Sequence, residues 1–214
     1  MKLTDKRLKA ILEELSGADS FADIGSDHGM LPVYALTNNI VKKVVATDIS
    51  LPSLEKARSL SQLYGVKLDT RLGDGLQPLR DKEVQAVVIA GMGGLEIIKI
   101  LKGNLHGFDK YILLPHKSAI ELREYLKAND IGIIRDRVVR DGKFFYHLIT
   151  CSILYKWNIN HSIFLGADNN IDDSDFNDYL NKRMCLLEKL ITKCGADKMG
   201  KFVEEKKELV RWIK

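Results

Sequence analysis

Five apolar segments that alternate with helical segments constrain the fold of this chain more than any other feature. Each has the length and composition of a strand, and the fourth, Val84–Ala90, is apolar at nearly every position. A strand that is apolar throughout is buried on both faces of a sheet. Five strand–helix units in succession therefore predict a parallel sheet with helices on both faces. The predicted strands are Ser20–Ile24, Lys43–Thr47, Lys67–Leu72, Val84–Ala90 and Tyr111–Leu114.

Helices are expected before and between these strands. The first is amphipathic, with Thr4 or Asp5 in position to cap it and Gly17 after its end. Ser118 is followed three residues later by Glu121, which is the spacing of a capping box at the start of the last helix. The expected helices are Thr4–Leu15, Leu31–Asn38, Pro52–Leu63, one that begins near Leu95, and Ser118–Asn129.

Two further apolar segments follow the fifth strand–helix unit. Gly132–Arg140 and Phe144–Leu154 flank the dipeptide Asp141–Gly142, which is typical of a tight hairpin turn. The hairpin adds an antiparallel pair, so the predicted class is α/β with a mostly parallel, seven-stranded, Rossmann-like sheet. This layout resembles class I methyltransferases, whereas a sheet that binds NAD ends differently.

The chain changes character after about Asn160. Apolar residues recur at steps of three or four from Phe176 to Cys194 and again from Phe202 to Ile213, with a glycine between the two runs. Two amphipathic helices with a short connection predict an antiparallel α-helical hairpin. We therefore divide the chain into a class I domain, residues 1–158, and a helical, coiled-coil-like arm, residues 159–214. The arm is either a packing or dimerisation element or a device that grips a substrate.

The composition is that of an ordinary globular protein. Of the 214 residues, 45% are hydrophobic and 29% are charged. No apolar run approaches the ~20 residues that cross a bilayer. Cys151, Cys185 and Cys194 lack the spacing of zinc ligands, which favours reduced thiols in the cytoplasm. We expect a cytoplasmic protein that binds neither metal nor membrane, most simply a monomer.

The positive charge is concentrated in the first part of the chain. The net charge is +4, yet from His161 to the end ten lysines and arginines face ten aspartates and glutamates. Basic clusters suit a polyanion such as RNA, and an ordinary solvated face is the alternative. The candidate RNA-binding residues are Arg7, Arg135, Arg137 and Lys143, with Lys6, Lys9 and Arg140 near them in sequence.

The stretch ADIGSDHGMLP, Ala22–Pro32, follows the first strand directly and resembles a nucleotide-binding glycine loop. When it is aligned on Gly25, the second and third glycine positions of the dinucleotide fingerprint hold Asp27 and Met30. A carboxylate beside a pyrophosphate is repelled. S-adenosylmethionine carries a sulfonium, an ammonium and no phosphate, so acids are favourable beside it. Asp23, at the strand end, suits the methionine ammonium.

Two more acids end the next two strands. Asp48, followed by Ile49, stands about 20 residues past the loop, where a carboxylate binds ribose hydroxyls. Asp74, followed by Gly75 in the sequence GDGL, can accept from the adenine amine. Aspartate is common in loops, so each signal is weak alone. Together they are stronger, because the carboxyl ends of parallel strands meet at the edge where ligands bind.

The fourth strand ends in AGMGG, Ala90–Gly94. Three glycines in four positions bring backbone close to a flat ligand, and a tight strand-to-helix turn is the alternative. In class I methyltransferases this corner faces both the methyl donor and the acceptor. The candidate cofactor contacts there are Ala90, Gly91, Met92 and Gly93.

Six motifs in one order carry a family resemblance: KRLKAI, ADIGSDHGMLP, ATDIS, GDGL, AGMGG and LREYL. They resemble the bacterial tRNA (adenine-22-N1)-methyltransferase family (TrmK), closely over about residues 5–150 and in layout over the tail. The resemblance implies a class I S-adenosylmethionine-dependent methyltransferase with a coiled-coil-like arm. It implies tRNA as the partner and methyl transfer to N1 of adenine 22 in the D-arm. The cofactor motifs of the family fall on Asp23, Gly25, Asp48, Asp74 and Gly91–Gly94.

Asp27, His28 and Arg7 match family positions near the mouth of the pocket. N1 of neutral adenine has a free lone pair and the methyl donor is already activated, so the reaction needs alignment more than a strong base. Asp27 is expected to stabilise the cationic product or to hold the adenine amine. His28 is either a catalytic base or an ordinary structural histidine.

Three positions depart from the family pattern: Leu114, His147 and Ala167. They concern the acceptor site more than the cofactor. Two alternatives stay open, namely a methyltransferase of another RNA and a non-catalytic RNA-binding protein that retains the fold.

Overall fold

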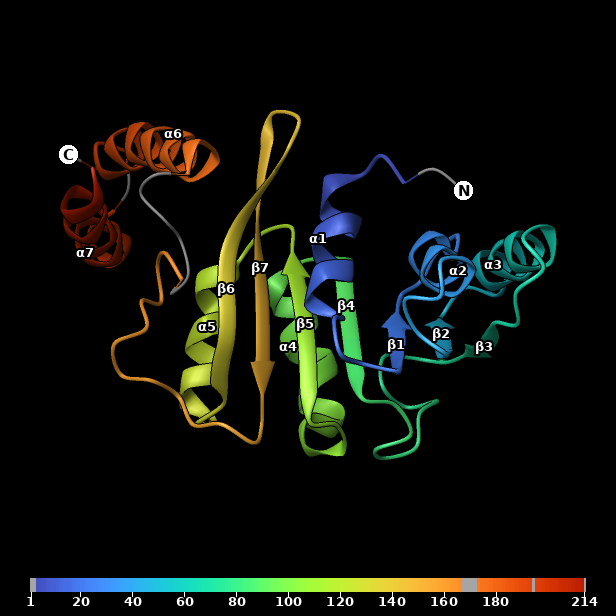
Figure 1. Ribbon diagram of the computed structural model, residues 1–214. Coiled ribbons are helices and arrows are strands. Elements are labelled where there is room, and N and C mark those ends of the chain that lie inside the picture. The colour runs from blue at the N-terminus through green and yellow to red at the C-terminus, as the bar shows by residue number, and fades with distance from the viewer. Residues whose placement is uncertain (1–2, 167–172, 194, 214) are drawn as a thin grey trace.

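The computed structural model describes residues 3–166, 173–193 and 195–213, and within them seven strands form one sheet (Figure 1). The strands are β1 (Ser20–Ile24), β2 (Lys43–Asp48), β3 (Asp69–Leu72), β4 (Ala86–Met92), β5 (Lys110–Pro115), β6 (Gly132–Asp141) and β7 (Phe144–Ser152). Their order is β3-β2-β1-β4-β5-β7-β6. The first five are parallel, and β7 is antiparallel to both β5 and β6. The predicted mostly parallel sheet with a terminal hairpin is confirmed.

Helices cover both faces of this sheet (Figure 1). They are α1 (Lys6–Glu14), α2 (Met30–Thr37), α3 (Leu51–Leu63), α4 (Gly94–Asn104), which runs into a short 3-10 turn at Leu105–Gly107, and α5 (Ala119–Ala128). The buried clusters place α1 and α2 on one face and α4 and α5 on the other. Among the described helices, none is both long and apolar enough to cross a membrane.

Strand β4 shows why the central segments are apolar throughout. Val88 belongs to the core beneath α1 and α2, whereas its neighbours Val87 and Ile89 belong to the core beneath α4. Successive side chains of a strand point to opposite faces, so a strand covered on both sides needs apolar residues at every position. The sequence pattern and the two-sided packing therefore agree.

The β6–β7 hairpin turns one residue later than predicted. Asp141 pairs with Phe144, so the loop consists of Gly142 and Lys143. Gly142 has a φ of +59°, in the left-handed region that favours glycine, and it occupies the first central position of the turn. The glycine thereby sets the register of the hairpin and places Lys143 at its tip.

The predicted capping box at the start of α5 is wrong. Ser118 precedes the helix with a φ of +60°, and its side chain makes no capping hydrogen bond within the described residues. A capping side chain requires an extended backbone at this position. Ser118 is left-handed instead. The corner that it belongs to, after β5, is held by a hydrogen bond of 2.8 Å from the Gly94 N–H to the Lys117 carbonyl. At α1 the Asp5 side chain caps the helix as expected, accepting from the Arg7 N–H at 2.8 Å.

The C-terminal helices α6 (Ser174–Ile191) and α7 (Ala196–Trp212) form the predicted antiparallel hairpin. They lie beside β6 at the edge of the sheet (Figure 1). Ala167 and Cys194 lie outside the described residues. The hairpin shares one core with β6 and the segment that precedes α6, formed by Val138, Phe164, Leu165, Phe176, Leu180, Leu187 and Leu209.

A buried ion pair lies beneath this attachment. Arg123 of α5 and Asp136 of β6 are both fully buried, and two hydrogen bonds of 2.6 and 2.8 Å join them. Arg123 also donates to the main-chain carbonyls of Ile163 and Phe164, at 3.3 and 3.4 Å. One guanidinium therefore connects α5, β6 and the segment that leads into the arm.

His147 of β7 belongs to the same network. Its Nδ1 lies 2.9 Å from the Arg123 guanidinium, which can only donate, and its Nε2 lies 3.2 Å from the Tyr179 hydroxyl of α6. Burial, with the positive charges of Arg123 and Arg183, lowers the pKa of His147 well below its usual value. A neutral His147 thus links the sheet to the arm, which accounts for one of the positions that depart from the family pattern.

Candidate functional site

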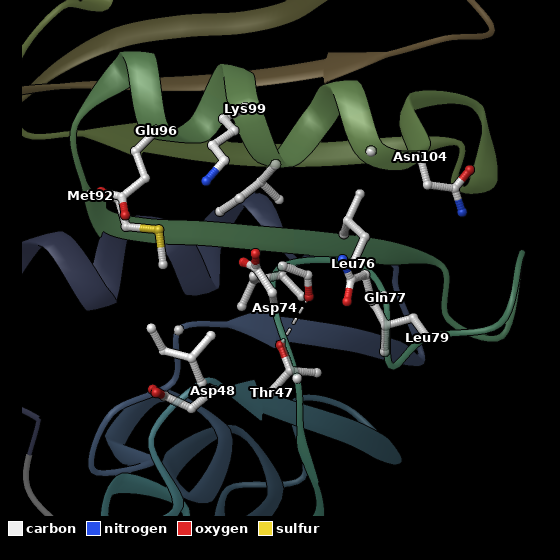
Figure 2. Close-up of a pocket in the computed structure, with 17 residues that line it drawn as sticks. Thr47, Asp48, Asp74, Leu76, Gln77, Leu79, Met92, Glu96, Lys99 and Asn104 are labelled. Atoms are coloured by element: carbon white, nitrogen blue, oxygen red, sulfur yellow. Dashed lines mark hydrogen bonds between the residues drawn. The ribbon is translucent and has the colours of Figure 1, made fainter.

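A cavity of about 580 Å³ opens at the carboxyl ends of β1 to β4 (Figure 2). In an open α/β sheet, this is the edge at which ligands bind. Asp48 and Asp74 reach it from the ends of β2 and β3, and Met92 reaches it from β4. The predicted cofactor contacts that line it are Gly25, Asp48, Ile49, Asp74, Gly75 and Met92.

Two left-handed glycines shape the loop between β1 and α2. Gly25 and Gly29 have φ angles of +70° and +71°. The N–H groups of Gly25 and Ser26 donate to the Thr47 carbonyl at 2.8 and 3.0 Å, which joins the loop to the end of β2. A Cβ on Gly29 would lie 2.7 Å from the Cβ of Ala57 in α3. The loop is therefore held between β2 and α3.

Two main-chain N–H groups orient Asp48. Its Oδ2 accepts from Asp27 at 3.0 Å, and its Oδ1 accepts from Ser50 at 2.8 Å. The carboxylate keeps further lone pairs with which it can accept from hydroxyl groups of a ligand. The loop that carries Asp27 thus also fixes the acid of the neighbouring strand.

Asp23 is the next-to-last residue of β1, and its side chain is buried. Burial raises the pKa of Asp23 to about 6; the Ser26 hydroxyl, which donates to it at 2.7 Å, opposes the shift, and the negative charge of Asp48 adds to it. An ionised carboxylate in such surroundings is stabilised by any cation that a ligand places beside it. Asp23 is therefore suited to a cationic group.

A second cavity, of about 200 Å³, adjoins the first at Gly25, which lines both. Most of the other predicted residues meet there: Asp23, Asp27, His28, Ala90, Gly91 and Arg7. Two described residues of the AGMGG corner line neither cavity: Gly93 is the N-cap of α4, and Gly94 is its first residue. The sequence thus predicted one site, and the structure divides it into two adjoining cavities.

Asp27 and His28 stand at the mouth of the smaller cavity. Their side chains are 66% and 51% exposed, so an incoming substrate can reach both. Nδ1 of His28 lies 3.0 Å from Oδ2 of Asp27. Asp27 has a φ of +48°, a left-handed conformation that aspartate and asparagine adopt more readily than most residues.

Arg7 reaches the same mouth from α1. Its guanidinium donates to Asp5 at 2.6 and 3.1 Å and lies 3.6 Å from the Asp141 carboxylate. It also lies 5.1 Å from the centre of the Tyr146 ring, within cation–π range. The Tyr146 ring in turn packs edge to face against the His116 ring, with 5.6 Å between the ring centres. A cation and two aromatic rings therefore stand beside the smaller cavity.

The larger cavity is acidic. The acids Asp48, Asp74 and Glu96 line it with one base, Lys99, and Asp23 adjoins it. This balance repels phosphate groups and attracts a cationic ligand. Across the described residues, no group of three or more histidine, cysteine or acidic side chains is arranged to hold a metal ion.

Residues 4–149 match the protein family described as a methyltransferase domain. The chain belongs to this methyltransferase family. The matched range contains the glycine loop, all three acidic strand ends and the AGMGG corner. The fold and the family therefore agree.

Curated and solved relatives of this methyltransferase domain carry more specific names. The tRNA (adenine(22)-N(1))-methyltransferase of Bacillus subtilis (strain 168) is 34% identical over 150 residues, which are 67% of this chain and 63% of that protein. The chain spans less than two thirds of the length of the curated relatives it matches.

Two solved structures share the fold of this methyltransferase domain. That of M. capricolum TrmK in complex with S-adenosyl-homocysteine has a TM-score of 0.82 and 23% identity, and the match covers 99% of this chain and 96% of that one. That of the B. subtilis M1A22 tRNA methyltransferase TrmK has a TM-score of 0.84 and 24% identity, covering 100% and 99%. The match includes the helical arm as well as the sheet.

Two predicted RNA-binding arginines of the methyltransferase domain are ion-paired within the fold. Arg135 lies 3.3 Å from Glu14, and Arg137 pairs with both Glu13 and Glu14. These pairs attach α1 to β6 and offset part of the positive charge. Lys143 stands at the hairpin tip, 5.4 Å from the centre of the Phe144 ring. These ion pairs leave less uncompensated positive charge on this part of the surface than the sequence indicated.

Sequence reasoning missed the wall that α4 supplies to the methyltransferase cavity. Glu96 and Lys99 line the larger cavity opposite the strand ends, with Leu76 and Leu79 as apolar surface (Figure 2). Ile100 of the same helix also lines it. The AGMGG corner predicted a helix at this place but not the face that it presents. The spacing of three and four along α4 is the signal that could have identified these residues.

Proposed function

We propose that this chain is an S-adenosylmethionine-dependent tRNA methyltransferase that modifies N1 of adenine 22 in the D-arm. One observation carries the proposal: an acidic cavity and an open mouth that holds Asp27 adjoin at Gly25. The cavity suits a cationic cofactor, and the mouth suits the base that receives the methyl group. The name of the B. subtilis relative specifies this adenine, and the M. capricolum structure holds the cofactor product.

The acids at the strand ends are proposed to hold the cofactor. Asp74 would accept from the adenine amine, Asp48 from the ribose hydroxyls, and Asp23 would pair with the ammonium group. Leu76 and Ile100 offer an apolar wall for the flat adenine ring. When bound, S-adenosylmethionine supplies a methyl group activated on a sulfonium.

The residues at the mouth are proposed to position the acceptor base. Alignment of a free lone pair with the methyl group accounts for much of the rate in such a displacement. The methylated adenine is cationic, so Asp27 would stabilise charge that grows in the transition state. N1 lies on the pairing edge, so the base must leave its stack. Tyr146, whose ring contacts Arg7 of the mouth, and His116 beside it are proposed as the rings on which the base stacks again.

The basic side chains around the mouth are proposed to bind tRNA phosphates. Arg7 lines the mouth and Lys143 stands at the hairpin tip, whereas Arg135 and Arg137 are ion-paired with acids of α1. We treat residues 159–214 as the arm that extends this surface and residues 1–158 as the catalytic domain. Binding should weaken as salt is raised, because phosphate contacts release counterions. A tRNA substrate would place the protein in the cytoplasm.

A methyl-transfer assay tests the proposal. The protein is incubated with methyl-labelled S-adenosylmethionine and a tRNA transcript with adenine at position 22, and a matched transcript with guanine there serves as the control. We expect 1-methyladenosine by mass spectrometry of the nucleosides, and a reverse-transcription stop at position 22, with the first transcript only. Transfer to another nucleoside, or tRNA binding without transfer, would favour the alternative readings.

Asp27→Asn is expected to retain cofactor binding and to lose roughly 10²-fold or more in kcat on tRNA, the scale of a lost electrostatic contact in a transition state. Asparagine removes the charge but tolerates the left-handed backbone at this position. Calorimetry measures the cofactor affinity, and single-turnover methylation measures the rate. A collapse of cofactor affinity with an unchanged single-turnover rate would instead place Asp27 in the cofactor site.

A further inference from the structure

Lys56 of α3 extends the Asp27–His28 pair into a chain of three side chains. Its Nζ lies 2.9 Å from Nε2 of His28, and Nδ1 of His28 lies 3.0 Å from Oδ2 of Asp27. The imidazole therefore stands between an ammonium and a carboxylate, with one ring nitrogen facing each. Nothing in the sequence pattern marks Lys56, because α3 lies outside the motifs at the strand ends.

These contacts select one form of His28. An ammonium group only donates hydrogen bonds, so Nε2 must accept, and the ring is then neutral with its proton on Nδ1. That N–H donates to the Asp27 carboxylate. The other neutral tautomer would place a donor against a donor at Nε2 and a lone pair against a carboxylate oxygen at Nδ1. The doubly protonated ring would also face the ammonium with a donor.

The backbone around this chain is well fixed. α3 contacts the loop at Gly29, where a Cβ would collide with Ala57, the residue next to Lys56. One turn earlier on α3, the Ser53 hydroxyl lies 3.5 Å from the other oxygen of Asp27. The Asp27 N–H is bound to Asp48. From α3, Ser53 thus contacts Asp27 directly and Lys56 contacts it through His28, while the Asp27 backbone is held from the end of β2.

We propose that Lys56 is a positioning residue: it holds His28 as the Nδ1–H tautomer, which in turn orients the Asp27 carboxylate at the mouth. Two consequences follow for the acceptor site. His28 does not act as a base, because its one lone pair is engaged by Lys56. The negative charge of Asp27 is directed by a hydrogen bond rather than left to rotate in solvent. The effect on turnover rests on the proposed function, whereas the tautomer does not.

The tautomer is measured by NMR on the protein alone. Long-range correlations between the ring protons and the two ring nitrogens, in protein labelled with ¹⁵N-histidine, distinguish the two neutral forms from each other and from the doubly protonated ring. The His28→Gln variant assigns the signal. We expect the Nδ1–H form in the wild type and in Lys56→Arg, and a larger fraction of the Nε2–H form in Lys56→Met, where Asp27 alone still selects the Nδ1–H form. An Nε2–H signal in the wild type, or no change in Lys56→Met, would overturn the proposal.

Kinetics test the consequence. Lys56→Met is expected to lower kcat on tRNA by roughly 10-fold or more, with the KM for tRNA and the cofactor affinity unchanged, because misplaced groups cost rate rather than binding. Lys56→Arg should restore most of the rate. Arg58→Met is the matched control. It also removes a cation from α3, but Arg58 donates to the Thr70 hydroxyl and not to the loop. A loss confined to the KM for tRNA would overturn the proposal and make Lys56 a phosphate contact. A wild-type protein inactive on tRNA would count against the proposed function and leave the tautomer result standing.

Discussion

Asp23→Asn is expected to make the protein more stable at neutral pH while it weakens S-adenosylmethionine binding by roughly 10²-fold or more, as loss of a buried charge pair does. The carboxylate is buried at the end of β1, and its pKa is raised from 3.8 to about 6. It is thus ionised at pH 7.5 in surroundings that disfavour its charge. A neutral amide of the same shape avoids that cost, yet it lacks the charge that the proposed pairing with the ammonium group of the cofactor requires.

The sign of the pH dependence follows from linkage. Because the folded-state pKa of Asp23 lies above the unfolded value, the folded protein binds more protons between pH 3.8 and about 6. Its free energy of unfolding therefore falls as pH rises through this window. A shift of about two units corresponds to about 3 kcal/mol, so the gain in Asp23→Asn should reach about 1–3 kcal/mol at neutral pH and shrink toward pH 4.

Urea denaturation at several pH values and cofactor calorimetry measure the two effects. In the role proposed for it, protonated Asp23 must lose its proton to pair with the ammonium. The wild-type affinity should therefore fall up to tenfold per pH unit below about pH 6, and Asp23→Asn should lose this dependence. Asp19→Asn is the control, since Asp19 is an exposed acid just before β1 that pairs with Lys42. A variant destabilised at neutral pH with unchanged cofactor affinity would contradict both the burial argument and the assigned role.

Arg123→Met should lower the free energy of unfolding by about 3–5 kcal/mol, which is the cost of leaving a buried charge without its ion-pair partner. Asp136 is fully buried, and Arg123 supplies it with two hydrogen bonds. The variant also withdraws the donor that binds the carbonyls of Ile163 and Phe164, ahead of the arm. Both losses fall on the attachment of the arm to the sheet.

Two further variants sharpen this measurement in urea. Lys201→Met removes an exposed ion pair with Glu124 that also joins the arm to α5, and it should cost less than about 1 kcal/mol. The double variant Arg123→Met with Asp136→Leu removes both buried charges and should recover part of the loss. If Arg123→Met cost no more than Lys201→Met, the buried pair would not be what secures the arm.

Much of the fold could be predicted because its signals are local. The strand Ser20–Ile24 begins and ends as predicted, since an apolar run bounded by polar residues and a glycine loop marks it fully. The end of β4 could not be predicted in this way: the expected strand ended at Ala90. The strand extends to Met92, because Met92 pairs with Pro115 of β5 past an irregularity in the ladder. That pairing depends on a neighbouring strand and leaves no trace in the segment itself.

Part of the candidate site could likewise be predicted from the sequence and part could not. Asp23, Asp48 and Asp74 could be brought together from the sequence because parallel strands present their carboxyl ends at one edge. Placement at that edge does not say which cavity each acid lines. Asp23 lines the smaller cavity and Asp48 the larger, and Gly25 lines both.

The sequence by itself determined the alternation of strands and helices along the chain, the terminal hairpin, the helical arm and the acidic edge, because periodicity, glycine placement and strand ends are properties of short segments. Only the tertiary structure decided the partners of individual side chains. Arg135 and Arg137 meet acids of α1, His147 accepts from a buried arginine, and Lys56 reaches His28. Each of these contacts joins segments far apart in the chain, so its energy depends on distances that no local pattern encodes.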